Sequence, residues 1–456
     1  MRSVIVAAVG LALILKDAVL VSLWARALAA RVAERRRPLV HAAAAVFGLA
    51  MSVPILLLAA TGFRVGLPGG DLAPLTLYSY ALYTWHIGGL LFFLALAAGS
   101  LVSTVARIPT GVARRLVRRY AGAVAPATPA TPAARAAPAP APAPAAADAG
   151  LTRREALVRA ALAVPPLLLA GATAQSWSLR GRFDVRHVRV PIPGLPAGLD
   201  GMTIAHVSDL HIGRLIDAEL LEPVVAAVTR LACDLVVVTG DTVDRSNDYL
   251  PPCIDAFRRM RAPLGLYACL GNHDRIDDAA VFVRSLRAAD IHGQGPRTLL
   301  TDESVVIERG GEAFVLGGVD YGRGDERHRA LVAKAFAAAP PRLPRILLAH
   351  HPHVFDAAAP AGVDLTLAGH THGGQIVLFR RDEEAVLDPD TIARSGETLA
   401  PGALLFRYLE GLYERRGRFL FVSRGAGNWW PLRINCPAEV TRLTLVAAPP
   451  PAPTPP

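Results

Sequence analysis

The chain has 456 residues, which is too long for one hydrophobic core and predicts two or three domains. Hydrophobic residues make up 52% of it and the net charge is +10. Residues 1–180 hold 18 basic and 5 acidic residues, whereas the remainder holds 30 basic and 33 acidic residues. The basic excess therefore belongs to the N-terminal part, and no nucleic acid is expected to bind the C-terminal part.

Three apolar stretches open the chain, at about residues 3–24, 39–63 and 77–105. Each reaches the ~20 residues that a helix needs to cross the hydrocarbon core of a bilayer. Lys16 and Asp17 interrupt the first stretch and are expected to neutralise each other at a local kink. His86, in the third stretch, is expected to pack between helices or at the interface. Residues 1–106 therefore form, by prediction, a membrane domain of about three transmembrane helices.

Arginine clusters follow the first and third apolar stretches. The first cluster comprises Arg26, Arg31, Arg35, Arg36 and Arg37, and the second comprises Arg107, Arg114, Arg115, Arg118 and Arg119. The loop between the second and third stretches carries only Arg64. Because basic loops stay on the cytoplasmic side, the N-terminus and the Arg64 loop are expected to face outward.

Residues 107–150 continue as a basic segment and an Ala/Pro-rich linker, which cannot build a core. In residues 151–177, Arg153-Arg154 precede an apolar run, and Ala172-Thr173-Ala174 resembles a cleavage site. This segment is either a fourth transmembrane helix or a twin-arginine-like signal or anchor. Both alternatives carry the rest of the chain out of the cytoplasm, so we predict a multi-pass protein of a bacterial-type cell membrane with an extracytoplasmic catalytic domain.

Residues 180–448 have the pattern of one α/β domain, and residues 449–456 form a disordered Pro-rich tail by prediction. Continuous apolar runs of strand length alternate with helical patterns, which indicates a sheet covered on both faces. Five runs end in polar residues, in MTIAHVSDLH, DLVVVTGDTVD, LYACLGNHD, RILLAHHP and VDLTLAGHTH. Functional residues in such folds gather beyond the carboxyl ends of the strands.

Seven of these polar residues have oxygen or imidazole ligand atoms. They are Asp209, His211, Asp241, Asn272, His350, His370 and His372. A nitrogen and oxygen set without thiolate suits Zn, Mn, Fe or Ni better than Ca or Mg. Seven ligands exceed one tetrahedral site and fit two ions ~3.5–4 Å apart that share a carboxylate. We therefore expect two divalent transition-metal ions, such as Mn, Fe or Zn, with Gly369, Gly373 and Gly374 allowing close approach and sharp turns.

The ordered set D-x-H, GDxxD, GNHD, His and GHxH resembles the calcineurin-like metallophosphoesterase superfamily over about Met202–Leu445. The later run VSRGAGNWWPLRINCPAEVTRLTL resembles a bacterial subfamily of membrane-attached or exported members. The resemblance implies a four-layer α/β/β/α sandwich, here preceded by an all-α transmembrane region. It places one ion on Asp209, His211, Asp241 and His372. It places the other on Asp241, Asn272, His350 and His370.

The resemblance also implies roles for three residues that are not ligands. His273 would contact the phosphate and act as general acid, and Asp244 and Asp274 would orient the ligands. His351 and His353 match no motif position, and Trp429-Trp430 is expected to be a packed core pair. The stretch from Arg380 to Leu399 departs from the family pattern, because it is longer and more charged.

The function predicted from these features is metal-dependent hydrolysis of a phosphodiester or pyrophosphate, on a lipid or envelope substrate at the membrane. Two alternatives remain. One is a UDP-2,3-diacylglucosamine-type diphosphatase of glycolipid metabolism, whose cytoplasmic substrate conflicts with the predicted topology. The other is a transporter or sensor with a non-catalytic ligand-binding domain, which has no need for the full ligand set and His273. The oligomeric state stays open.

Overall fold

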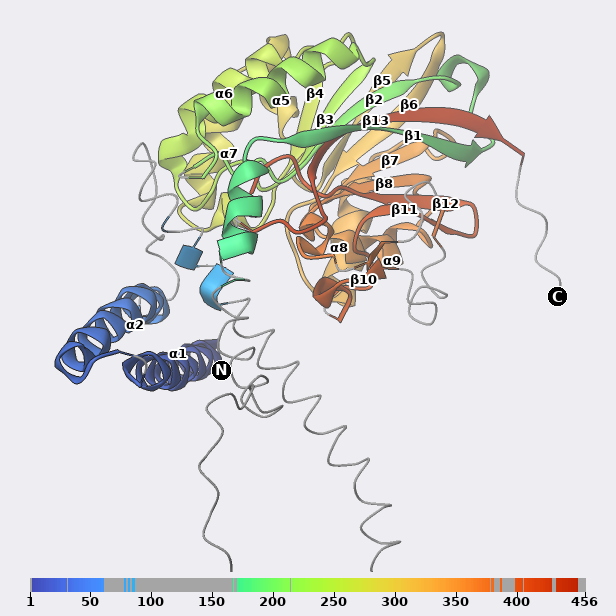
Figure 1. The fold of residues 1–456 in the computed structure, drawn as a ribbon. Helices are drawn as coiled ribbons and strands as arrows, with labels where there is room; N and C mark the ends of the chain where they lie inside the picture. The colour runs from blue at the N-terminus through green and yellow to red at the C-terminus, as the bar shows by residue number, and fades with distance from the viewer. Residues whose placement is uncertain are drawn as a thin grey trace, which may run out of the picture. The chain divides into compact units, whose positions relative to one another are not determined.

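The structure, a computed structural model, describes an N-terminal helical part and a larger α/β part (Figure 1). The described residues are 2–30, 32–60, 78, 81–82, 84–86, 167, 170–213, 215–377, 379–380, 386–387, 398–404, 406–428 and 432–449. Several predicted features lie outside them: most of the third apolar stretch, the Ala/Pro linker, the segment around Arg153-Arg154, Trp429-Trp430, most of Arg380–Leu399 and the Pro-rich tail.

The N-terminal part begins with two long helices, α1 (Arg2–Ala29) and α2 (Arg37–Ala60), joined through a short 3-10 helix at Glu34–Arg36. The first two apolar stretches are thus helical, as expected. Gly48 lies on α2 where a Cβ atom would be 3.6 Å from Val21 of α1, so a small residue lets the helices approach closely. Among the described residues, one segment, Glu34–Pro54, is long and apolar enough to cross a membrane.

Two mixed sheets form the α/β part. The first has the order β1-β13-β2-β3-β4 and the second the order β11-β12-β8-β7-β6-β5. The strands of the first are β1 (Phe183–Pro193), β13 (Ala438–Ala448), β2 (Thr203–Val207), β3 (Leu235–Thr239) and β4 (Leu266–Cys269). Those of the second are β11 (Gly411–Arg415), β12 (Arg418–Val422), β8 (Leu365–Ala368), β7 (Arg345–Leu348), β6 (Glu312–Gly318) and β5 (Glu303–Arg309). Strands β2, β3 and β4 are parallel, as are β6, β7, β8 and β12.

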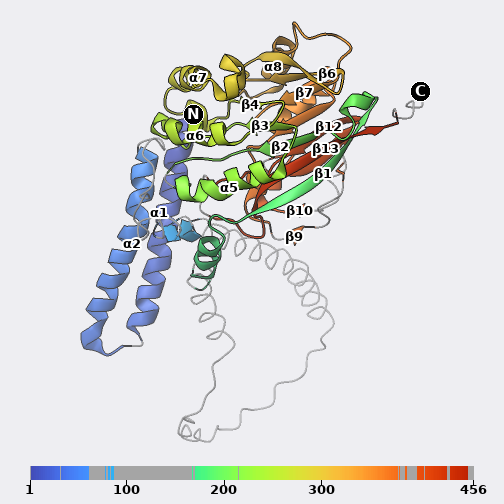
Figure 2. The ribbon, with the colours of Figure 1, turned by 90° about the horizontal axis from the view of Figure 1, so that it is seen from above.

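The two sheets pack face to face, and helices cover their outer faces (Figures 1 and 2). Strand β3 shows how the sequence specifies this: Leu235 and Val237 point into the core between the sheets, whereas Val236 and Val238 pack under the helices. Helices α5 (Ala218–Leu231), α6 (Leu250–Arg259) and α7 (Ala279–Ala288) cover the first sheet. Helices α8 (Asp325–Ala335) and α9 (Phe355–Ala358) cover the second. The expected four-layer α/β/β/α sandwich is confirmed.

Helix ends follow local sequence signals. Asp217 precedes α5 and accepts a hydrogen bond from the Leu220 amide at 3.0 Å. Asp278 does the same for α7, accepting from the Ala280 and Val281 amides. The remaining elements are short: 3-10 helices at Ala197–Leu199, Asn247–Tyr249, His273–Arg275, Ile291–Gly293, Gly295–Thr298, Pro352–Val354, His372–Gly374 and Pro401–Leu404, and the pair β9 (Phe379–Arg380) and β10 (Thr398–Leu399).

Candidate metal centre

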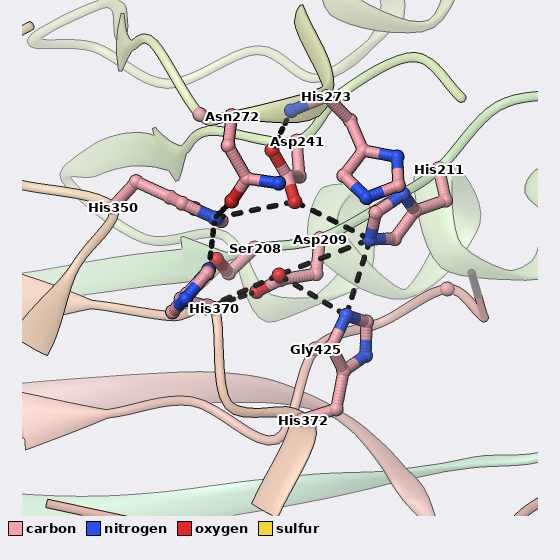
Figure 3. Close-up of polar contacts among 12 residues, drawn as sticks. Ser208, Asp209, His211, Asp241, Asn272, His273, His350, His370, His372 and Gly425 are labelled. Carbon is pink, nitrogen blue, oxygen red and sulfur yellow. Dashed lines mark hydrogen bonds and ion pairs between the residues drawn. The ribbon is translucent and has the colours of Figure 1, made fainter. Parts of the chain in front are cut away.

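The predicted ligands converge at one edge of the sandwich, where parallel strands of both sheets end (Figure 3). Each follows its strand within four residues, in the loops after β2, β3, β4, β7 and β8. The strand order explains the convergence, because β2, β3 and β4 are neighbours in one sheet and β7 and β8 are neighbours in the other. Side chains as far apart in sequence as Asp209 and His372 thereby meet.

One group of ligand atoms is made by Asp209, His211 and His372, all of them buried. His372 Nε2 lies 3.2 Å from Asp209 Oδ1, and His211 Nε2 lies 3.1 Å from His372 Nε2 and 3.9 Å from Asp209 Oδ1. Figure 3 shows the three side chains pointing toward a common centre.

A second group is made by Asp241, His350 and His370, joined by Asn272. His350 Nε2 lies 3.2 Å from Asp241 Oδ2, 3.2 Å from Asn272 Oδ1 and 3.1 Å from His370 Nδ1. Asp241 also reaches the first group, because its Oδ2 is 3.6 Å from His211 Nε2. All seven predicted ligands therefore lie in one constellation, with Asp241 between its halves.

The chemistry of this donor set fits two metal ions. Ligand atoms about 2.1 Å from one ion at tetrahedral angles lie about 3.4 Å apart, which is close to the observed separations of 3.1–3.9 Å. In addition, the Nε2 atoms of His211 and His372 lie 3.1 Å apart and face each other. There is room for a hydrogen on only one of them, so the other presents a lone pair to the centre. A cation bound by both nitrogens and the Asp209 carboxylate would satisfy all three groups.

The imidazole of His350 is already held in the orientation that a ligand needs. Its Nδ1 donates a hydrogen bond to the Thr239 carbonyl oxygen at 2.8 Å, which directs Nε2 toward Asp241 and Asn272. Burial lowers the pKa of His350, but the carboxylates of Asp241 and Asp209 outweigh burial and raise it to about 9. The two carboxylates thus attract positive charge into the centre.

The pKa values of His370 and Asp209 are also shifted by their charged neighbours. Burial and then the neighbouring His350 lower the pKa of His370 to about 3. Burial would raise the pKa of Asp209, but His372 and His350 together outweigh burial and lower it. The carboxylate is therefore ionised and His370 neutral at neutral pH, as both must be to bind a metal.

The backbone at the ligands is unusual. Five of them adopt left-handed φ values, with Asp209 at 53°, His211 at 46°, Asp241 at 50°, His370 at 74° and His372 at 51°. Non-glycine residues rarely adopt this conformation, and residues that do so cluster at functional sites. Each turn lets a side chain fold back over the end of the strand from which it comes.

Two glycines leave room for the carboxylates. A Cβ atom on Gly369 would lie 1.9 Å from Ser208 Oγ and 2.2 Å from Asp209 Oδ2. A Cβ atom on Gly271 would lie 2.1 Å from Asp241 Oδ1. Neither position tolerates a side chain, which agrees with the close approach expected of Gly369. Gly373 and Gly374 have φ values of +61° and +78°, as the expected sharp turn requires.

His273 lies beside the ligands. Its Nδ1 is 2.9 Å from Asp244 Oδ1, and its ring meets the His211 ring edge-on at 4.5 Å. Its backbone amide donates to Asp241 Oδ1 at 2.7 Å. Burial would lower the pKa of His273, but Asp241 and Asp244 outweigh burial and raise it. His273 is therefore an imidazole that carries a proton more readily than usual.

The buried carboxylate of Asp274 connects two of the loops that carry candidate ligands. Its Oδ1 accepts hydrogen bonds from the Thr242 amide, the Thr242 hydroxyl and the Val243 amide, at 2.8, 2.8 and 3.2 Å. Its Oδ2 accepts from the Gly271 amide at 2.8 Å. The carboxylate thus joins the loop that carries Asp241 to the loop that carries Asn272.

Sequence reasoning missed Arg433, which is buried behind His372. Its guanidinium donates to the carbonyl oxygens of Arg424 and Gly427, both at 2.9 Å, and lies 3.3 Å from His372 Nδ1. The amide of Gly427 in turn donates to the Asp209 carbonyl oxygen. Arg433 therefore holds the loop that supports the D-x-H motif. Its position within the run VSRGAGNWWPLRINCPAEVTRLTL was the available signal.

An aromatic wall borders the second group. The Tyr321 ring, in the loop after β6, lies 6.0 Å from the His370 ring and 6.1 Å from the His350 ring. His351, one of the two histidines at no motif position, lies against His370 with ring centroids 4.8 Å apart. Burial and then His370 lower its pKa to about 2. His353 lies further out, 5.5 Å from Tyr408.

Arg323 adds a positive charge at this wall. Its Nε donates to the Tyr321 hydroxyl at 2.6 Å. The neighbouring Asp320 is occupied by Arg275, whose Nη1 lies 2.8 Å from both carboxylate oxygens. Within the described part of the chain, Arg323 forms no ion pair, so its charge remains for an anionic group.

Comparisons with known proteins agree with this geometry. Residues 202–374 match the family model described as calcineurin-like phosphoesterase. Phosphodiesterase YaeI of Escherichia coli (strain K12) is 31% identical over 253 residues, which cover 53% of this chain and 82% of that protein. The transmembrane protein with metallophosphoesterase domain of Bos taurus is 28% identical, with 58% of this chain and 57% of that protein covered. UDP-2,3-diacylglucosamine pyrophosphatase LpxG of Chlamydia trachomatis serovar D is 27% identical, with 62% and 96% covered.

Proposed function

The chain belongs to the calcineurin-like metallophosphoesterases, a family of metal-dependent phosphoric ester hydrolases with a dinuclear centre, and we propose that it cleaves a phosphodiester or pyrophosphate at the membrane. The family and the hydrolase class expected from the motifs are confirmed. The constellation that unites Asp209, Asp241 and their five partners carries the proposal, because a ligand-binding module would not need both halves.

The ligand roles follow the two halves of the constellation. Asp209, His211, Asp241 and His372 would hold one ion. Asp241, Asn272, His350 and His370 would hold the other. The nitrogen and oxygen donors favour Mn, Fe or Zn. When bound, two such cations would make water acidic enough to attack phosphorus at neutral pH and would neutralise charge on the phosphoryl oxygens.

The chain itself supplies the proton for the leaving group. Asp244 fixes the His273 ring through Nδ1, and Nε2 would contact the phosphate and protonate the departing oxygen. The raised pKa, which Asp241 and Asp244 cause against the effect of burial, favours the protonated form of His273. Asp274 takes no part in proton transfer in this proposal and holds the loops in place.

Relatives and charge support the substrate class. One relative is named a phosphodiesterase and another a UDP-2,3-diacylglucosamine pyrophosphatase. The free charge of Arg323 beside the second half of the centre would suit a substrate with an additional phosphoryl group. A pyrophosphate linked to a lipid combines these features, and a UDP-diacylglucosamine-type substrate is the second candidate because LpxG is matched over 96% of its length.

The proposed topology places the catalytic domain, residues 180–448, outside the cytoplasm. Two arginine clusters on one side and the segment led by Arg153-Arg154 support this orientation. The segment Glu34–Pro54 and a relative named as a transmembrane protein support attachment to the membrane. An extracytoplasmic site favours an envelope or lipid substrate over a nucleotide-linked one.

Metal analysis and hydrolysis assays on the purified full-length protein test the proposal. We expect about two transition-metal ions per chain and cleavage of bis-p-nitrophenyl phosphate. Asp241→Ala should lose metal and activity together. His273→Ala should keep metal and lose about 10²–10⁴-fold in rate with a poor leaving group, and less with p-nitrophenolate.

Three outcomes would contradict these roles. A wild-type protein that binds no Mn, Fe or Zn would exclude a metal-dependent reaction at this centre. Loss of metal from His273→Ala equal to that from Asp241→Ala would make His273 a ligand. An equal rate deficit for both leaving groups would make His273 a phosphate-binding residue and not a proton donor.

A further inference from the structure

A second buried polar cluster lies within the N-terminal helical part, far in sequence from the metal ligands. Asp17 is at its centre, with a side chain only 2% exposed. Asp17 Oδ1 accepts a hydrogen bond from Trp85 Nε1 at 2.7 Å and lies 2.9 Å from Lys16 Nζ. Asp17 Oδ2 accepts from Ser52 Oγ at 3.0 Å. The carboxylate thus joins α1, α2 and the helical segment 84–86.

The hydrogen bond made by His86 fixes which of its ring nitrogens carries a proton. His86 Nε2 lies 2.8 Å from the Met51 carbonyl oxygen, which can only accept, so Nε2 must be the donor. A neutral His86 therefore has a bare lone pair on Nδ1. That atom is buried, has no hydrogen-bond partner among the described residues, and lies 3.8 Å from Asp17 Oδ2.

This arrangement leaves two acceptors facing each other in a buried place. An unpaired buried lone pair opposite a carboxylate is unfavourable, and one proton on Nδ1 removes the conflict by forming an ion pair. Asp17 already faces three donors, from Trp85, Ser52 and Lys16, whereas His86 Nδ1 has no hydrogen-bond partner among the described residues, so the proton belongs on His86. A metal ion is disfavoured there, because the Lys16 ammonium lies beside the same carboxylate.

We propose that Asp17 and His86 form a binding site for one proton, buried among the N-terminal helices. The charged groups that face it are Lys16 and Asp17 on α1, while Ser52 and the Met51 carbonyl face it from α2. Protonation adds an ion pair between α1 and the segment 84–86. Packing of that segment against α1 and α2 therefore tightens as the pH falls. This site does not depend on the proposed hydrolytic function.

Trp85 links the proton site to a wider aromatic contact. The Lys16 ammonium lies 5.0 Å from the centre of the Trp85 ring, and the ring meets Trp24 at 5.3 Å and Phe47 at 5.1 Å. A change of charge at His86 therefore acts on a residue that packs against both α1 and α2. Proton binding would in this way alter the packing of three helical segments.

Nitrogen-15 NMR of the full-length protein, labelled at histidine and reconstituted in lipid, tests the proposal. The His86 signals are identified as those missing from His86→Gln, whose side-chain amide can still donate to the Met51 carbonyl. We expect Nδ1 of His86 to gain a proton in one step as the pH is lowered. In Asp17→Asn the step should move to lower pH by about one unit or more, since an opposite charge at this range shifts titration by that amount.

The controls separate this site from general effects. His41→Gln should leave the His86 transition unchanged, and Asp17→Asn should retain helix content by circular dichroism. A His86 Nδ1 that stays unprotonated down to about pH 5, or a transition that is the same in Asp17→Asn, would overturn the proposal. A transition displaced by sodium or potassium in competition with protons would identify a cation site instead.

Discussion

Replacement of Asp274 by alanine should separate structural support from catalysis at the metal centre. The carboxylate accepts hydrogen bonds from three buried backbone amides, those of Thr242, Val243 and Gly271, and from the Thr242 hydroxyl. Alanine removes the acceptor and leaves those donors facing an apolar methyl group. The hydroxyl can rotate to another acceptor, whereas the three amides cannot.

The expected cost follows from the number of orphaned donors. Each buried donor without a partner costs about 1–3 kcal/mol. A water molecule in the vacated space would recover part of this, so we expect Asp274→Ala to destabilise the protein by about 3–5 kcal/mol, which is at the upper end for single substitutions. Asp274→Asn keeps the oxygen that accepts three of the bonds but presents its NH₂ group to the Gly271 amide. It should therefore cost about 1–3 kcal/mol.

Asp278→Ala is the matched control. Asp278 also accepts from two backbone amides, those of Ala280 and Val281, but at the exposed start of α7. Loss of such a helix cap costs about 1 kcal/mol. Thermal unfolding of the full-length variants should rank them Asp274→Ala, Asp274→Asn, Asp278→Ala, from lowest to highest Tm. At about 2–4 °C per kcal/mol, the first should fall by about 10 °C.

The hydrogen bonds of Asp274 to the two loops also predict an effect of its replacement on metal binding. Asp241 and Asn272 are held by the loops that Asp274 joins, so both alanine and asparagine variants should bind metal more weakly, and added metal should restore part of the activity. If Asp274→Ala unfolds at the same temperature as Asp278→Ala, the four hydrogen bonds do not carry the stability assigned to them. If it is destabilised yet binds metal as tightly as the wild type, Asp274 does not position the ligands.

Three further predictions address charge, topology and metal. Arg323→Met should raise KM for a pyrophosphate substrate by about 10–100-fold, the loss expected for a charge-assisted hydrogen bond, and should leave hydrolysis of bis-p-nitrophenyl phosphate nearly unchanged. The control Arg329→Met, on the exposed face of α8, should leave both activities nearly unchanged. Equal losses for both substrates would remove Arg323 from pyrophosphate recognition. Alkaline phosphatase fused after Leu445 should be active, and activity of a cytoplasm-only reporter there would reverse the topology. Chelation of metal should lower the Tm, since ions at about 100 times their Kd contribute about 2.7 kcal/mol, and an unchanged Tm would mean that the folded chain does not bind them.

The convergence of the candidate ligands could be predicted because each lies in a loop that follows a recognisable apolar strand. The run DLVVVTGD shows this: its valines form β3, and Asp241 follows directly in the loop at the sheet edge. The four-layer fold came from the family resemblance, and the strand pattern agrees with it. By contrast, β13, the last strand of the domain, lies between β1 and β2, its first two strands. No local sequence pattern specifies such a pairing.

The supporting contacts could not be predicted, because they join residues that are distant in sequence. Asp17 and Trp85 are 68 residues apart, and the sequence indicated only a locally neutralised Lys16–Asp17 pair. Arg433 supports His372 from 61 residues away. A motif records which side chains a site needs, whereas the hydrogen bonds that hold those side chains depend on how separate loops meet.

The left-handed backbone at the ligands links the chemistry of the centre to its stability. A non-glycine residue in this conformation costs about 1 kcal/mol or more, and five ligands share it. The other two candidate ligands, Asn272 and His350, follow their strands without a left-handed φ. Glycine would relieve the strain at these five positions, but it has no atom that could bind a metal. Gly271 and Gly369, which precede Asn272 and His370, are the positions where the neighbouring carboxylates exclude a Cβ atom. In these two loops a glycine leaves space for a carboxylate, and the next residue supplies a candidate ligand atom.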